Sequence, residues 1–405
     1  MKKRRYDAIF LLDQIPYSNV GGAPSYNAAL LRASEALGWR ILVLVTGRRL
    51  PGPIFSTERV ADNATLVFAQ AVSMGGNRFV ASTPSSFMRG VKRVVEKYRK
   101  PRQATEKRLI IERFPNAAEV DRVHRILDRI EAPLTFVDTI FRDPYMGVDA
   151  IAPNTVLIGH DVFHERVASF EANGFQVVPN VDFDAERARV TRYKNILAIS
   201  DVDAATYRRM APHSDVRTVF PIVPKAAGPR LTNPQSNRIV YLGSAAHHNV
   251  DGLVWFLDQI WPRVLKRRPD AVLDVVGMIG HSISPHPNVM VHGRVDDISA
   301  ISRQAAFAIN PIRMGSGLKI KMVDYFNLGL GCITTDVGAH GFPIGVHPFM
   351  IANEEDEFAD AVETWLKDAS ICQEMSEKTD AYMRHFSLEA IMETLKLCTA
   401  ALPER

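Results

Sequence analysis

The stretch that most constrains the fold runs from Ala306 to Phe342 and reads AFAINPIRMGSGLKIKMVDYFNLGLGCITTDVGAHGF. Its apolar run over 306–310 is typical of a buried parallel strand, and the glycine turn 315–317 interrupts that run before a helical pattern over 318–328. A second strand is predicted over 332–335. The order strand, glycine turn, helix and strand is therefore the unit around which we expect the rest of the chain to be organised.

The glycine turn has the features of an anion site. Free backbone amides at a helix start, beside Lys319 and Lys321, suit a phosphate or diphosphate because both the donors and the helix dipole favour negative charge. Lys321 and Asp324 are three residues apart and share a helix face, so that one side chain can hold phosphate while the other accepts from sugar hydroxyls. Glycine-rich turns before helices are common, and an ordinary helix with surface lysines fits the same residues.

The length of the chain predicts two domains, because 405 residues exceed one typical hydrophobic core. Prolines, glycine and polar residues gather from Phe220 to Asn237 with little periodicity, which indicates a linker. We expect a first domain over 1–222, a linker over 223–237, a second domain over 238–386 and a closing helix over 387–405.

Composition excludes several classes of protein. Three widely spaced cysteines indicate neither a disulfide framework nor a zinc site, and no apolar run approaches the roughly 18 residues of a membrane span. The first apolar run, between Asp7 and Asp13, is too short for a signal peptide, so a cytoplasmic protein is expected. The net charge of +4 is a local excess and does not predict nucleic-acid binding.

The first domain opens with a predicted βαβ unit: a strand over 6–12, a loop over 17–22, a helix over 23–37 and a strand over 41–45. Gly21 and Gly22 therefore lie at the carboxyl end of a parallel strand, where open sheets bind ligands. A paired glycine is also a common turn, and both interpretations stay open.

A histidine marks the end of another predicted strand, over 155–160. His160 is well placed there to reach a ligand between the domains, and an imidazole suits proton transfer at neutral pH. Asp161 and His164 are rival candidates, and His160 satisfied at a strand end is the alternative without function.

Two sequence features suggest cation and membrane chemistry. Asp201 and Asp203, like Asp182 and Asp184, have the spacing of paired metal ligands, but acids after Ser200 fit a helix cap better, and we predict no metal site. The segment 89–108 is a predicted basic amphipathic helix. Such a helix either rests on anionic lipid or has an ordinary solvated face.

The stretch 306–342 resembles the nucleotide-sugar-binding segment of GT-B glycosyltransferases, specifically the large retaining group called family 4. That segment has a strand ending in proline, a Gly-Ser-Gly turn, a basic pair, a Lys-x-x-Glu, a glycine, a strand and a Gly-x-x-Gly. The matching positions are Pro311, Gly315, Ser316, Gly317, Lys319, Lys321, Asp324, Gly329, Cys332, Gly338 and Gly341. The chain departs from the family where Asp324 replaces glutamate and where Ser316 lies at or near an earlier acid.

The resemblance runs from Arg238 to Ala352 and extends, more weakly, to Thr155–Tyr207 and Tyr17–Val45 of the first domain. It implies that His160 is the active-site histidine and that Gly22 approaches the donor diphosphate or the acceptor. It implies that the backbone at Arg294 and Val295 reads the nucleotide base. The implied ligands of the diphosphate are Gly243, Ser244, Arg313, Gly315, Ser316, Gly317, Lys319 and Lys321.

The resemblance implies an α/β protein of the GT-B fold, with two Rossmann-like, doubly wound parallel-sheet domains facing each other across a cleft and a last helix that crosses back to the first domain. The implied activity moves a sugar, with retention, from a nucleotide diphosphate sugar to a hydroxyl of a glycan, a lipid-linked sugar or a small molecule, as in polysaccharide biosynthesis. No metal or other cofactor is expected, since lysines can neutralise the leaving diphosphate. A nucleotide-sugar 2-epimerase and an inactive partner subunit are the alternatives.

Overall fold

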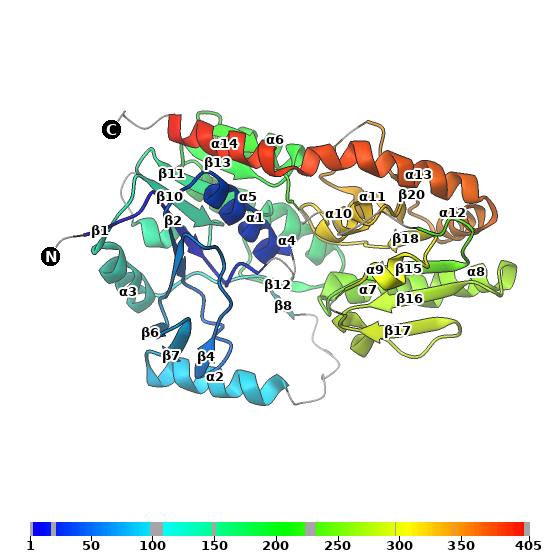
Figure 1. Cartoon of the computed structure of the whole chain (residues 1–405), viewed down its shortest axis with the longest axis horizontal. Helices are drawn as coiled ribbons and strands as arrows, with labels where there is room; N and C mark the ends of the chain where they lie inside the picture. The colour runs from blue at the N-terminus through cyan, green and yellow to red at the C-terminus, as the bar shows by residue number, and fades with distance from the viewer. Residues whose placement is uncertain are drawn as a thin grey trace.

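The computed structural model describes residues 3–17, 22–97, 108–147, 151–222, 232–295, 297–343 and 345–400. Two separate large sheets organise these residues, and Figure 1 shows them side by side along the long axis of the molecule. Helices cover the sheets of both halves (Figure 1). The α/β fold class predicted from the sequence is confirmed.

The first sheet has the strand order β14-β13-β11-β10-β2-β3-β5-β6-β7-β4. Its central strands are parallel, and several are buried along their whole length, as a sheet covered on both faces requires. The parallel strands are β2 (Ala8–Leu12), β3 (Ile41–Val45), β5 (Ala64–Phe68), β10 (Leu134–Asp138), β11 (Thr155–Gly159), β13 (Asn195–Ala198) and β14 (Asp215–Thr218). The antiparallel edge consists of β4 (Ile54–Ser56), β6 (Ala71–Gly75) and β7 (Arg78–Ala81).

Helices and two small ladders complete this half of the chain. The helices are α1 (Gly22–Ala36), α2 (Pro84–Lys97), α3 (Ala117–Leu127), η1 (Asp143–Met146), α4 (Phe163–Ala172), α5 (Phe183–Val190) and α6 (Asp201–Met210). The ladders pair β1 (Arg4–Arg5) with β9 (Ile130–Glu131) and β8 (Arg108–Ile110) with β12 (Gln176–Val178).

The second sheet is entirely parallel, in the order β17-β16-β15-β18-β19-β20. Its strands are β15 (Arg238–Leu242), β16 (Val272–Val276), β17 (Val289–Gly293), β18 (Phe307–Asn310), β19 (Cys332–Thr334) and β20 (Phe349–Ile351). The helices are α7 (His247–Trp255), the π-helical η2 (Phe256–Ile260), α8 (Trp261–Arg267), η3 (Met278–Ser282), α9 (Ser299–Ser302), α10 (Ile320–Asn327), α11 (Asp336–Ala339), α12 (Glu355–Lys367), α13 (Ala369–Tyr382), η4 (Met383–Phe386) and α14 (Leu388–Ala400).

The closing helix α14 packs against α1, so the chain ends on the half where it began. Figure 1 shows α13 over the second sheet and α14, continuing the same direction, over the first. None of the described helices combines the length and the apolar character that crossing a membrane requires.

The basic helix predicted over 89–108 is wrong at both ends. Helix α2 begins five residues earlier, because Thr83 and Ser86 cap it reciprocally: each hydroxyl accepts from the other residue's amide, at 3.1 and 3.0 Å. Arg108 belongs to β8, where pairing with β12 determines the backbone, and residues 98–107 lie outside the described residues.

Candidate functional site

The glycine turn connects β18 to α10 and is shaped by two left-handed glycines. Gly315 and Gly317 have φ of +111° and +68°, a region that side-chain-bearing residues rarely adopt. The helix that follows has Lys319 at its N-cap, and no side chain caps its first amides. The Met322 amide donates to the Lys319 carbonyl at 2.8 Å, which leaves the amides of Ile320 and Lys321 to meet an anion.

Two lysines flank this helix start, and within the described part of the chain neither forms an ion pair with an acidic side chain. The ammonium of Lys319 is buried and donates to the carbonyls of Ser316 and Gly317, at 3.1 and 2.7 Å. That of Lys321 donates to Asn249 Oδ1 at 2.5 Å and to the Tyr241 hydroxyl at 3.2 Å. Among the described residues, no carboxylate oxygen lies within 4.0 Å of either nitrogen.

Burial makes both lysines unusually acidic. Desolvation lowers the pKa of Lys319 to about 8, although the charges of Asp161 and Asp203 oppose the shift. It lowers the pKa of Lys321 to about 7, helped by the charge of Lys319. Because desolvation disfavours the charged form of both lysines, a bound anion would stabilise them in the protonated form.

A second uncapped helix start meets the first. Helix α7 begins after Ala246, again with no capping side chain. The Asn249 amide joins the two starts, because its nitrogen donates to the Ser244 hydroxyl at 3.0 Å while its oxygen accepts from Lys321. His248 in the same turn has a pKa well below the usual value, through burial and the nearby cations, and is therefore neutral at pH 7.

Asp324 lies one turn beyond Lys321 and is partly buried. Desolvation raises the pKa of its carboxyl to about 7, so that it is partly protonated at neutral pH. A carboxyl in that state can both donate and accept hydrogen bonds.

His160 lies on the first-domain side, immediately after β11. Its Nε2 is 2.6 Å from Asp138 Oδ1, and its ring meets the edge of Tyr26 from α1 at 5.0 Å between centroids. Burial opposes ionisation of Asp138, but the His160 interaction and the Arg142 charge outweigh it and lower the pKa of the carboxyl. His160 Nδ1 is buried and has no hydrogen-bond partner in the described ranges, so one ring nitrogen is left over for a ligand.

Direct contacts bring the two domains together at the glycine turn. The Ser316 hydroxyl donates to Asp161 Oδ1 at 3.0 Å, and the Gly315 amide donates to Ser169 Oγ at 2.9 Å. A Cβ on Gly317 would overlap that same Asp161 oxygen and lie 3.0 Å from the His160 carbonyl. The turn and the His160 segment, predicted independently, therefore form one region.

Several predicted residues take up other contacts. Arg313 forms a bidentate ion pair with Asp251, at 2.9 Å, and its guanidinium stacks over Trp255. Arg294 is exposed and Val295 packs against the core. Gly22 begins α1, while 18–21 of its loop lie outside the described residues.

The rival candidates also have defined partners. Asp161 pairs with Arg166, and His164 Nδ1 is 2.8 Å from Glu186 Oε2. The expected helix cap is present, since Ser200 Oγ accepts from the Asp203 amide at 3.1 Å. The sequence did not single out Asp138 and Tyr26, because only the parallel pairing of β10 with β11 and the packing of α1 bring them to His160.

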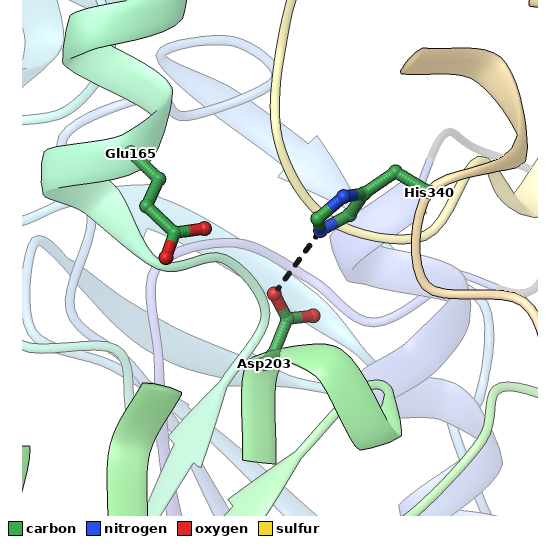
Figure 2. A group of neighbouring side chains, drawn as sticks. All are labelled: Glu165, Asp203 and His340. Carbon is green, nitrogen blue, oxygen red and sulfur yellow. Dashed lines mark ion pairs between the residues drawn. The ribbon is translucent and has the colours of Figure 1, made fainter. Parts of the chain in front are cut away.

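One group of side chains has the composition of a metal site. Glu165, Asp203 and His340 place their ligand atoms within 4.8 Å of one another (Figure 2). Sequence spacing had suggested Asp203 as a metal ligand only together with Asp201, and it could not point to this group because the three residues come from α4, α6 and the segment after α11.

Comparison with known proteins connects this geometry to a family. Residues 236–368, which include the glycine turn and both uncapped helix starts, match the family model for glycosyl transferases group 1. A protein of Klebsiella pneumoniae, described as an uncharacterized 44.6 kDa protein in the cps region, is 26% identical over 142 residues. That alignment covers 32% of this chain and 37% of the relative.

Solved structures match the fold over nearly the whole chain. Staphylococcus aureus TarM superposes with a TM-score of 0.65 at 10% identity, covering 98% of both chains. WaaG, a glycosyltransferase involved in lipopolysaccharide biosynthesis, gives 0.58 at 14% identity, covering 98% of this chain and 100% of that one. Anabaena HepE, solved with UDP-glucose, gives 0.59 at 12% identity with the same coverage. The chain thus has the GT-B fold of two Rossmann-like domains, and residues 236–368 of its second domain match the model of the glycosyl transferases group 1 family.

Proposed function

We propose that this protein moves a sugar from a nucleotide diphosphate sugar to a hydroxyl acceptor. One observation carries the proposal: Lys319 and Lys321 hold one buried and one partly buried ammonium group, without carboxylate partners among the described residues, at the uncapped start of α10. A diphosphate supplies the negative charge that this arrangement lacks.

The proposed chemistry depends on charge that develops late. When the nucleoside diphosphate departs, negative charge grows on its oxygens, and donors already aimed there stabilise the transition state more than the ground state. We assign this role to Lys319, Lys321 and the amides of 315–317, with Gly243 and Ser244 beside them. The Gly315 amide, which donates to Ser169 Oγ, and the Gly243 amide, which donates to the Val276 carbonyl, take part only if they leave these partners. Arg313 joins only if it leaves Asp251 when the donor binds.

The remaining roles follow from the same proposal. Asp324 accepts from donor sugar hydroxyls, Arg294 and Val295 present backbone to the base, and Gly22 lies near the diphosphate or acceptor. His160, oriented by Asp138, contacts the transferred sugar or the acceptor through its unpartnered Nδ1. Transfer proceeds with retention, and the donor phosphate assists the incoming hydroxyl.

Transfer is proposed to need no Mg²⁺, because the lysines neutralise the diphosphate themselves. UDP is the first donor nucleotide to test, since TarM and HepE have both been solved with it. Calorimetry should give the same UDP affinity with and without added Mg²⁺. A strong Mg²⁺ requirement would contradict the proposal.

The acceptor is proposed to be lipid-linked and reached from the cytoplasmic face of a membrane. Helix α2 packs on β7, at the edge of the first domain seen at the bottom of Figure 1. This unit exposes large apolar side chains, Ile54, Val72, Met74, Phe87, Met88, Val94 and Val95, alongside Arg78 and Arg93. Apolar groups among cations suit an anionic bilayer.

Two assays test the function. Nucleotide sugars with different bases are incubated with the protein and lipid-extracted acceptors, and transfer is followed by mass spectrometry with Lys321→Ala as the inactive variant. A nucleotide sugar epimerised without acceptor would support the 2-epimerase instead, and nucleotide binding without any product would support the inactive subunit.

Flotation with phosphatidylglycerol vesicles, compared with phosphatidylcholine vesicles, tests the membrane surface. The double substitution Met88→Glu and Val95→Glu should abolish flotation with the phosphatidylglycerol vesicles.

A further inference from the structure

Glu165, Asp203 and His340 lie where the two domains meet, and Asp203 is near enough to Lys319 for its charge to raise the pKa of that lysine. Figure 2 shows Glu165 on α4 and Asp203 on α6, both in the first domain, with His340 reaching toward them from the second. Their ligand atoms all lie within 4.8 Å of one another.

Two of these atoms are buried and unsatisfied. Asp203 is fully buried; its Oδ2 accepts from the Ser200 hydroxyl at 2.8 Å, while its Oδ1 has no hydrogen-bond partner among the residues that the structure describes. His340 Nε2 is likewise buried without a partner and lies 3.9 Å from that Oδ1, too far for a hydrogen bond. An unmet buried polar group costs about 1–3 kcal/mol, so a ligand that satisfies both atoms is favoured.

The segment that carries His340 is fixed in place. The Thr335 hydroxyl accepts from the Gly338 amide at 2.9 Å and donates to the Ile312 carbonyl, which ties α11 to the strand end before the glycine turn. Gly341 has φ of +84°, and a Cβ there would lie 3.0 Å from Ser200 Oγ. The histidine is therefore held against the start of α6.

We infer that Glu165, Asp203 and His340 bind one divalent transition-metal ion that bridges the domains. Imidazole with two carboxylates suits Zn²⁺, Co²⁺ or Mn²⁺, whereas Mg²⁺ prefers oxygen ligands alone. A tetrahedral ion with bonds of about 2.0 Å needs donors about 3.3 Å apart. The side chains of Glu165 and His340 are 31% and 29% exposed, which leaves them room to close on the ion.

The neighbouring cations are Arg209, near Glu165, and Lys319, whose pKa the charge of Asp203 raises. Glu165 Oε1 accepts from the Thr206 hydroxyl at 3.0 Å and lies 3.8 Å from Arg209, which leaves it only weakly paired. Asp203 has no ion pair besides the long His340 contact among the described residues. Two ligands come from one domain and one from the other, so the ion holds the domains in this arrangement. Its role is structural and separate from the transfer chemistry.

The test is Co²⁺ binding to untagged full-length protein that has been treated with a chelator. A visible absorption band should saturate at one ion per chain and be displaced by Zn²⁺. His340→Ala should weaken Co²⁺ binding at least tenfold, while His281→Ala, an exposed histidine of the same domain, should leave it unchanged.

A second variant guards against misfolding. Glu165→Gln changes a partly exposed position and should weaken Co²⁺ binding as His340→Ala does. Asp203→Asn is not used, because Asp203 is part of the cap of α6. Equal Co²⁺ binding by wild type and His340→Ala, or no saturable binding by the wild type, overturns the inference. No nucleotide is present, so the outcome is independent of the proposed transferase activity.

Discussion

Ser316 and Asp161 share a 3.0 Å hydrogen bond that joins the glycine turn of the second domain to the residue following His160 in the first. The resemblance places an acid at or near the position of Ser316. In this chain the carboxylate beside Ser316 is that of Asp161, which belongs to the other domain. The turn and the first-domain segment are thus set relative to each other by a specific contact, and changes at either are expected to be felt at both.

Lys321→Ala should weaken UDP binding at least tenfold. A hydrogen bond to a charged group contributes about 1.5–3 kcal/mol, and each 1.4 kcal/mol is tenfold in affinity. Calorimetry measures the effect, with Lys266→Ala, an exposed lysine of the same domain, as the matched control. Equal losses in the two variants would place the phosphate elsewhere.

UDP affinity should fall between pH 7 and pH 9. The phosphate binds protonated lysine, and with pKa values of about 7 for Lys321 and about 8 for Lys319 a growing fraction must take up a proton on binding as the pH rises. The UDP phosphate itself is fully ionised in this range. Titrations in buffers of different ionisation enthalpy should show net proton uptake near pH 8, and Lys321→Arg should flatten the profile. An affinity that rises with pH would contradict this account.

Asp324→Asn should raise thermal stability at pH 8 relative to wild type, with a smaller gain at pH 5. The pKa of the folded state is about 7, above the unfolded value of about 3.9, so the folded state binds the proton more tightly. The stabilisation of the folded state by this proton is complete below the unfolded pKa and is lost as pH rises through the folded pKa of about 7. Thermal melts at both pH values measure it, with Asp258→Asn, 50% exposed, as the control.

Gly317→Ala should reduce UDP affinity and transfer more than Gly38→Ala does. Both glycines have positive φ, of +68° and +73°, so both substitutions cost about 1–2 kcal/mol of backbone strain. Only the Cβ at Gly317 meets the other domain, at Asp161, whereas that at Gly38 has open space. Matching melting temperatures with different affinities would isolate the interdomain contact, and matching affinities would exclude a role for it.

His160→Ala should lower transfer at least tenfold while leaving UDP affinity unchanged, because its Nδ1 is assigned to the sugar or acceptor. Asp138→Asn should reproduce part of the loss through misorientation of the ring. His164→Ala is the comparison, since that imidazole pairs with Glu186. Full activity in His160→Ala would move the assignment to Asp161 or His164.

The sequence by itself determined the local units of this protein. Apolar runs such as Ile41–Val45 and Phe307–Asn310 predict buried parallel strands because burial on both faces of a sheet demands continuous apolar side chains. The glycine turn and the helix after it were predictable for a different reason: positive φ and helix starts depend on neighbouring residues in the sequence. The antiparallel strands β4, β6 and β7 escaped prediction, because most of their residues are exposed or half-buried and form no continuous apolar run.

Only the tertiary structure decided the chemistry of the site. The low pKa of Lys321 arises from desolvation beside Tyr241 and Asn249. Asp251 holds the Arg313 guanidinium in an ion pair, and Asp138 orients the His160 ring. The Glu165–Asp203–His340 group exists only where two domains touch. Desolvation and long-range contacts set these properties, and both depend on which distant segments the fold places side by side.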